Sequence, residues 1–216
     1  MQYVTIIEPV LEVTLVGTAT PHPWLPLLQA EGLTLSASTD RAIVMISATA
    51  STYKGLSFRE LSVSIQVEGN RFFLPHADNS IRWFAWVERK FFQTPYRYGQ
   101  VTTQPMHIAA VEQGIPVFEA RLPADASYQE DNEVNELVIH LPKSLRKRAD
   151  DPHFFYARLE GAAHIYDGHA ASVTINAGAA QPIWDLLRRS DFQVNEWRVR
   201  QSARHSKSKT YEGSPV

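Results

Sequence analysis

Four polar residues, Glu60, Arg89, Tyr96 and Arg97, are the strongest candidates for chemistry in this sequence. A guanidinium can hold the carboxylate of a substrate through two parallel hydrogen bonds. A carboxylate in an apolar pocket can have its pKa raised towards neutrality and then act as an acid or a base. A tyrosine hydroxyl can donate a hydrogen bond to a developing oxyanion. Together these groups would suit proton transfer or bond cleavage next to the carbonyl group of a small keto acid.

Two predicted strands with a turn between them would position these residues. Residues 57–67 alternate between apolar and polar side chains, which is typical of a strand with one buried face. Its apolar face would carry Leu61, Val63, Ile65 and Val67, and its polar face Glu60, Ser62, Ser64 and Gln66. Residues 81–92 are rich in aromatic side chains and predict a second strand, which ends before Pro95 because proline has no amide hydrogen. Arg89 then falls on an otherwise apolar face.

The same region resembles the acetoacetate decarboxylase-like superfamily. The segments that carry the resemblance are Phe58-Arg59-Glu60 and Glu88-Arg89-Lys90-Phe91-Phe92-Gln93-Thr94-Pro95-Tyr96-Arg97. The family has an aromatic-x-Glu sequence at the start of one strand and, farther on, a Gly-Arg-Glu-x-Trp-Gly-aromatic-Pro-Lys-Lys motif. Arg89 lies six residues before Pro95, as the family arginine does before its proline. Glu60 corresponds to the family's pocket glutamate, and Phe92 stands where the family has tryptophan.

Tyr96 and Arg97 stand where the family has two lysines, the first of which forms a Schiff base. A Schiff base needs a primary amine that is free near neutral pH, which neither residue supplies. The resemblance therefore implies a divergent member that acts on a small keto acid or related organic acid by acid/base chemistry without a Schiff base. Lys54 and Lys90 are the candidate replacements for the missing amine.

The resemblance also implies a fold and a set of site residues. The expected fold is mainly β, a large antiparallel barrel or bent sheet around a central cavity with a few short helices. Glu60 and Tyr96 would be catalytic, Arg89 and Arg97 would anchor the substrate, and Trp83 and Phe92 would line its pocket. The structural alternative is an ion pair between Glu60 and Arg89 on adjacent strands, with Tyr96 packed in a turn.

Length and composition limit the remaining alternatives. The chain has 216 residues, a net charge of −2 and no cysteine, so it can bury a sizeable core but has no thiolate chemistry or thiolate metal site. We expect a single β-rich domain over residues 1–201 and a polar, basic and flexible tail over 202–216. Residues 182–192 predict a helix, and the loop after Pro23 predicts at most a short one, whose Trp24, Leu27 and Leu28 would cap the barrel or line a lipophilic opening.

Cofactors and macromolecular partners are not expected. Glycine-rich phosphate loops are absent, and His164 and His169, which flank a predicted hairpin turn at Asp167-Gly168, do not match a known metal-binding spacing. The near-neutral charge and the lack of a long apolar run predict a cytoplasmic protein that binds a small molecule rather than nucleic acid or membrane. Two alternatives stay open: a non-catalytic barrel that encloses an apolar or weakly polar ligand, and an assembly protein, such as a homo-oligomer, whose tail contacts a partner.

Overall fold

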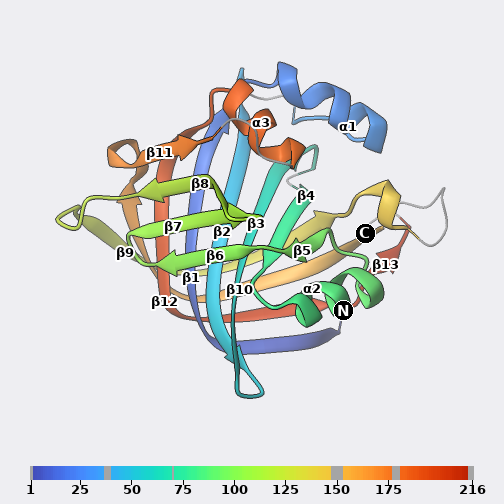
Figure 1. Cartoon of the computed structure of the whole chain (residues 1–216), viewed down its shortest axis with the longest axis horizontal. Coiled ribbons are helices and arrows are strands. Elements are labelled where there is room, and N and C mark those ends of the chain that lie inside the picture. The colour runs from blue at the N-terminus through green and yellow to red at the C-terminus, as the bar shows by residue number, and fades with distance from the viewer. Residues whose placement is uncertain (1, 37–39, 70, 147–152, 177–180, 214–216) are drawn as a thin grey trace.

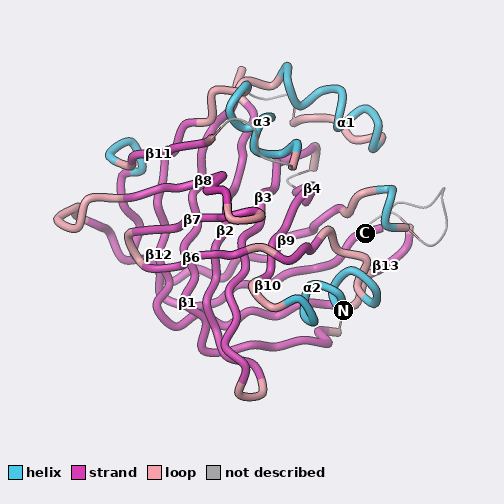
Figure 2. Tube along the Cα trace, in the orientation of Figure 1, coloured by secondary structure: helices cyan, strands magenta, loops and turns pink. Residues whose placement is uncertain are grey.

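Strands dominate the protein, as the sequence predicted (Figures 1 and 2). The computed structural model describes residues 2–36, 40–69, 71–146, 153–176 and 181–213. These residues form two β-sheets and three short α-helices. The mainly β architecture with few helices is therefore confirmed.

The larger sheet closes on itself. Its main strands are β1 (Tyr3–Ala19), β2 (Ala42–Tyr53), β3 (Leu56–Val67), β4 (Arg71–Asn79), β9 (Tyr128–His140), β10 (His153–Asp167) and β12 (Gln193–Ser208). They pair in the order β12-β1-β2-β3-β4-β9-β10, and β10 pairs again with β12, so the strands form a ring. The short strands β5 (Tyr96–Tyr98) and β13 (Tyr211–Glu212) add to β4 and β10. The ring is antiparallel except where β4 runs parallel to β9, and β5 is likewise parallel to β4.

The smaller sheet crosses one side of this ring (Figure 1). It contains β6 (Gln100–Gln104), β7 (His107–Glu112), β8 (Ile115–Arg121) and β11 (Ser172–Ile175), in the order β11-β8-β7-β6. The main hydrophobic core includes residues of both sheets, among them Phe118 of β8 and the apolar face of β3, with Leu61, Val63 and Ile65. The alternation predicted for residues 57–67 is thus confirmed, because one face of β3 is fully buried.

Two of the helices cover one end of the sheets. α1 (Leu25–Glu31) follows a 3-10 turn over His22–Trp24, and α3 (Pro182–Arg189) lies near it in Figure 1. Trp24 and Leu28 are buried in the main core, which favours the cap over the lipophilic opening, the two alternatives that the sequence left for these residues. The helix predicted from Pro182 is confirmed as well. Further 3-10 turns span Lys143–Leu145 and Gly168–Ala170. Among the described residues, none of the helices has the length and apolarity that crossing a membrane requires.

The strand predicted over residues 81–92 is wrong, because this segment forms helix α2 (Arg82–Phe91). The segment between the two predicted strands, which was predicted as a turn, forms strand β4. At the junction, the Oδ1 atom of Asn79 accepts a hydrogen bond of 2.7 Å from the backbone amide of Ile81, a local turn that redirects the chain. Ala85 is buried and Trp83, Trp86 and Phe91 are exposed, so most of the aromatic side chains that suggested a strand do not enter the hydrophobic core.

Two further predictions need correction. Residues 202–208, predicted to begin a polar tail, continue strand β12 and pair with both β1 and β10, while residues 214–216 lie outside the described part. The hairpin predicted around Asp167-Gly168 is absent, since β10 belongs to the larger sheet and β11 pairs with β8 in the smaller one.

Candidate functional site

Glu60 lies on the polar face of β3, which points into the ring. Glu60, Ser62 and Ser64 line a cavity of about 180 Å³, here called the inner cavity. Glu60 also lines an adjoining cavity of about 370 Å³, here called the aromatic cavity because Tyr53, Phe58 and other rings form its wall. The alternation along β3 therefore separates the core from the ligand space.

Two hydrogen bonds hold the carboxylate of Glu60. The Tyr96 hydroxyl donates to Oε2 at 2.9 Å, and Nδ2 of Asn79 donates to Oε1 at 2.7 Å. Asn79 lies opposite Glu60 in the antiparallel pair of β3 and β4. Because the Oδ1 atom of Asn79 accepts from the amide of Ile81, its Nδ2 atom must face Glu60. Glu60 therefore pairs with neutral donors, and the predicted alternative of a Glu60–Arg89 ion pair is not formed.

The pKa of Glu60 is strongly shifted. Burial raises the pKa of this carboxyl group to about 7, and the nearby charge of Glu88 acts in the same direction. The hydrogen bonds from Tyr96 and Asn79 and the charge of Lys207 oppose this rise. Burial and the two carboxylates also raise the pKa of Tyr96 well above its usual value, so its hydroxyl stays protonated. A carboxyl group with a pKa near 7 can both accept and donate a proton at neutral pH.

Lys207 brings an amine into the inner cavity. It lies in β12 opposite Thr5 of β1 and Ala157 of β10. Its Nζ atom forms a short ion pair with Oε2 of Glu88, and the same oxygen accepts a hydrogen bond of 2.9 Å from the hydroxyl of Thr94. The amine also lies 4.7 Å from the ring centre of Phe92, within the range of a cation–π contact. Lys207 thus connects the ring to α2, the helix that carries Glu88.

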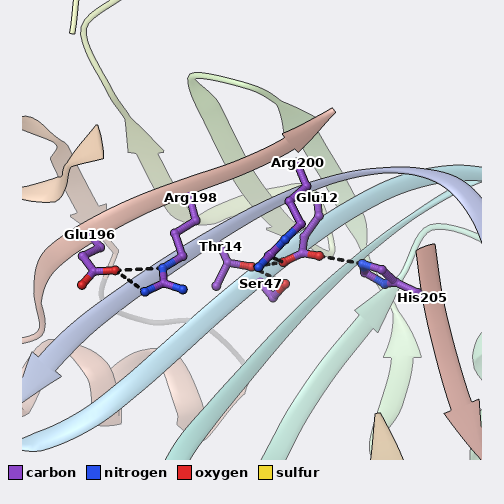
Figure 3. Close-up of polar contacts among 7 residues, drawn as sticks. All are labelled: Glu12, Thr14, Ser47, Glu196, Arg198, Arg200 and His205. Carbon is purple, nitrogen blue, oxygen red and sulfur yellow. Dashed lines mark hydrogen bonds and ion pairs between the residues drawn. The ribbon is translucent and has the colours of Figure 1, made fainter. Parts of the chain in front are cut away.

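A buried polar network holds a second residue of the cavity wall (Figure 3). Nε2 of His205 lies 2.6 Å from Oε2 of Glu12. The other carboxylate oxygen of Glu12, Oε1, accepts a hydrogen bond of 2.8 Å from Arg200 and one of 2.9 Å from the hydroxyl of Thr14. Burial opposes ionisation of Glu12, but the hydrogen bond and charge of His205 and the charge of Arg200 outweigh it, so the pKa of Glu12 is lowered. His205 lines the inner cavity, so an imidazole fixed by a buried carboxylate faces the ligand space.

The structure brings together some of the site residues predicted from the sequence and not others. Glu60 and Tyr96 line the inner cavity, and Trp83 and Phe92 line the aromatic cavity. Arg89 and Arg97 line neither; both contribute to a separate pocket of about 210 Å³ near Pro95. Nη1 of Arg97 donates to Oε1 of Gln181 at 2.6 Å.

The lysines proposed to replace the family amine lie elsewhere. Lys54 sits in the exposed turn between β2 and β3, and Lys90 is exposed on α2. Neither lines the inner or the aromatic cavity, whereas Lys207 does line the inner one. Sequence reasoning missed Lys207 and His205 because both fall in the segment interpreted as a tail. His205 and Lys207 lie two positions apart, as do side chains on the same face of a strand, and this spacing was the signal that could have identified them.

The histidines at the predicted hairpin turn do not form a cluster. The ring of His164 stacks on Tyr128 with 4.1 Å between centres, and Nδ1 of His169 lies 2.8 Å from Asp167 at an exposed position. Within the described ranges, neither belongs to a group of side chains that could hold a metal ion.

Solved structures with a similar fold span nearly the whole chain. Acetoacetate decarboxylase from Legionella pneumophila subsp. pneumophila str. Philadelphia 1 is 11% identical with a TM-score of 0.66, and the match covers 97% of this chain and 87% of that chain. An acetoacetate decarboxylase-like enzyme from Sphingomonas wittichii RW1 is 12% identical with a TM-score of 0.58, covering 97% and 93%. No family model and no curated protein matches the sequence.

A third neighbour is the enduracididine biosynthesis enzyme MppR, complexed with the condensation product of pyruvate and imidazole 4-carboxaldehyde. It is 13% identical with a TM-score of 0.60, and the match covers 96% of this chain and 89% of that chain. The chain therefore has the acetoacetate decarboxylase-like fold, as the sequence resemblance implied.

Proposed function

We propose that the inner cavity binds a small keto acid or related organic acid and that Glu60 exchanges a proton with it. The observation that carries this proposal is the position of Glu60, a cavity-lining carboxyl group held by two neutral donors, whose pKa burial raises to about 7. Both protonation states of such a group are populated near neutral pH, so it can take a proton from a carbon next to a carbonyl and return it. Tyr96 and Asn79 act as positioning residues, because their hydrogen bonds are made to Glu60.

Lys207 and His205 replace Arg89 and Arg97 as the proposed partners of the anionic substrate. Both line the inner cavity with Glu60, and each is held by a carboxylate, Glu88 or Glu12. An ammonium group near the carbonyl oxygen would stabilise the enolate that forms when Glu60 removes the proton. His205 gives the cavity a second side chain that can form a hydrogen bond with the substrate.

We propose that this chemistry proceeds without a Schiff base, even though Lys207 provides an amine. Its partners are Glu88, within ion-pair distance, and the rings of Phe92 and Phe155, at 4.7 and 4.8 Å from the Nζ atom to the ring centres. These are partners of an ammonium group, whereas imine formation needs a neutral amine. The test is reduction with borohydride in the presence of pyruvate followed by mass spectrometry. A reduced adduct on Lys207 would replace the acid/base proposal with covalent catalysis.

Proton exchange itself is measured by nuclear magnetic resonance in deuterated water. Pyruvate, 2-ketobutyrate and acetoacetate are the probes, and deuterium incorporation next to the carbonyl group is the signal. We expect Glu60→Gln to reduce the exchange rate by about 100-fold or more, since general acid–base catalysis contributes roughly that much. Ser62→Ala is the matched control, because it changes the same cavity wall without removing a titratable group. Equal rates in the wild type and Glu60→Gln would refute the proposal.

A non-catalytic binding protein is the second candidate, and the aromatic cavity favours it. Its wall includes Tyr53, Phe58, Trp83, Phe84 and Phe92, which suit an apolar or weakly polar ligand. Native mass spectrometry of the purified protein would detect a retained ligand. A ligand that is released intact, together with no exchange on any keto acid, would favour binding over catalysis.

A further inference from the structure

A second cluster of ionisable side chains lies next to the candidate site, on the other side of β4. Asp78 directly precedes Asn79, so the two side chains point to opposite faces of the strand. Asn79 faces Glu60, whereas Asp78 and His76 face Glu112 at the end of β7. The exposed fractions of His76, Asp78 and Glu112 are only 3%, 2% and 8%, and none of the three lines the inner or the aromatic cavity.

The three side chains converge on one point. Nε2 of His76 lies 3.1 Å from Oδ2 of Asp78 and 4.0 Å from Oε1 of Glu112, and one ligand atom from each residue falls within 4.8 Å of the other two. The backbone of Gly99 packs closely against the carboxylate of Asp78. A Cβ atom at position 99 would lie 2.7 Å from Cγ of Asp78, so only glycine leaves room for this carboxylate. Trp184 of α3 donates to Oε1 of Glu112 at 2.6 Å.

One oxygen of this cluster is unsatisfied. Oε2 of Glu112 is buried and has no hydrogen-bond partner among the described residues. An unpaired buried acceptor is costly, and a bound cation would give this oxygen a partner.

We propose that His76, Asp78 and Glu112 form a binding site for a divalent transition-metal ion, with Zn²⁺ as the best-fitting member of that class. Imidazole nitrogen and carboxylate oxygen are ordinary zinc ligands, and a bond of about 2 Å to each places ligand atoms roughly 3.3 Å apart around a tetrahedral ion. The 3.1 Å separation between His76 and Asp78 is close to this value, and Glu112, at 4.0 Å from His76, would move inward to complete a set of three protein ligands. Mg²⁺ and Ca²⁺ are disfavoured because they prefer oxygen ligands alone.

The position of the site suggests a structural role. His76 and Asp78 belong to the ring, Glu112 belongs to the smaller sheet, and Trp184 links Glu112 to α3. An ion bound to the three side chains would join these parts where β4 also supports Glu60 through Asn79. Metal binding is therefore expected to stabilise the packing of the two sheets, and it is independent of whether the inner cavity is catalytic.

The test uses Co²⁺ and Zn²⁺ on the full chain after treatment with a chelator. We expect one equivalent of Co²⁺ to produce visible absorption bands typical of a four- or five-coordinate ion, Zn²⁺ to remove these bands by displacement, and saturating Zn²⁺ to raise the Tm. Glu112→Gln is the main variant, because its amide oxygen still accepts from Trp184 while the second ligand oxygen is lost. We expect its Zn²⁺ affinity to fall at least 10-fold.

A matched control separates this site from adventitious binding by other histidines. Glu119→Gln makes the same substitution in a more exposed pair, where Nε2 of His107 lies 2.9 Å from the carboxylate, and we expect it to bind Zn²⁺ like the wild type. If Glu112→Gln does not fold, His76→Gln takes its place. Absence of stoichiometric Co²⁺ and Zn²⁺ binding by the wild type would overturn the proposal, as would unchanged binding in both cluster variants.

Discussion

The hydroxyl of Tyr96 donates a hydrogen bond of 2.9 Å to the carboxylate of Glu60, although the two residues lie 36 positions apart. The contact forms because β5, which carries Tyr96, pairs in parallel with β4, while β4 pairs on its other side with β3 and Glu60. In the sequence resemblance to the acetoacetate decarboxylase family, Tyr96 corresponds to the lysine that forms a Schiff base there. Here that position holds a side chain that tunes a carboxyl group.

We predict that Tyr96→Phe raises the pKa of Glu60 above its value of about 7. The hydrogen bond from Tyr96 favours the charged carboxylate, so its removal favours the protonated form. The pH dependence of deuterium exchange, or carbon-detected titration of the glutamate side chains, measures the shift. Tyr98→Phe is the control, because Tyr98 is exposed and its ring packs on Arg82. A Glu60 pKa that stays the same or falls in Tyr96→Phe would contradict this assignment.

Substitutions in the ion pair of Lys207 and Glu88 should move the pKa of Glu60 in opposite directions. Lys207→Met removes a charge that lowers this pKa and should raise it, while Glu88→Gln removes a charge that raises this pKa and should lower it. The pair is mostly buried, with side-chain exposures of 17% and 19%, so Lys207→Met should also cost about 1–3 kcal/mol of unfolding free energy.

The double variant Glu88→Gln/Lys207→Met tests whether this loss comes from an unpaired charge. It should recover part of the stability lost in Lys207→Met, because no isolated carboxylate remains. Lys209→Met is the control, since Lys209 is the next lysine along the chain and is exposed. Urea unfolding provides the free energies. Additive effects of the two substitutions would show that the pair is not coupled.

Two buried histidines should make the protein sensitive to acid. Burial, together with the nearby charge of Arg146, lowers the pKa of both His140 and His153 to about 4, and Arg71 adds to the effect at His140. Between pH 6.5 and 4 the unfolded chain therefore binds protons that the native protein does not. The stability that depends on these two groups is lost as the pH falls through that window, by at most about 3 kcal/mol for each.

His140→Gln removes one of these groups and should weaken the loss of stability between pH 7 and pH 4.5, measured by urea unfolding. His169→Gln is the control, because His169 is exposed. Glu60 contributes with the opposite sign, since its raised pKa makes the native protein bind an additional proton between about pH 4.5 and 7. Each variant is therefore compared with the wild type at the same pH. Parallel stability curves would exclude His140 as a source of acid sensitivity.

Removal of residues 202–216 should prevent folding, rather than only change the oligomeric state. The truncation deletes the part of β12 that pairs with Ile6 and Ile7 of β1 and with Leu159 of β10, so β12 keeps its pairing with β10 only over residues 196–199. It also deletes Thr210, whose hydroxyl donates to the backbone oxygen of Phe92 at the end of α2. Circular dichroism during heating tests this, with a chain shortened after Gly213 as the control. A cooperative transition in the chain that lacks residues 202–216 would show that the last part of β12 is dispensable for folding.

The sequence alone determined the features that depend on local pattern. Alternation along residues 57–67 identified β3 and placed Glu60 on the face opposite Leu61 and Val63, and the structure confirms that one face enters the core. The same reasoning failed for residues 81–92, since Trp83 and Trp86 favour strands by type, whereas their exposure and the burial of Ala85 follow a helical period.

Tertiary structure alone decided which groups share the inner cavity with Glu60. His205 and Lys207 lie in the last part of β12, where residues 204–208 are all polar, so this part of the strand lacks the apolar stripe that would identify it. Closure of the ring through β10 and β12 brings them to Glu60 and Glu88 from more than 100 residues away. The pattern of apolar residues in a sequence indicates which side chains are buried in an apolar core. Which side chains meet across a closed sheet depends instead on strand order and register, and only the folded chain defines these.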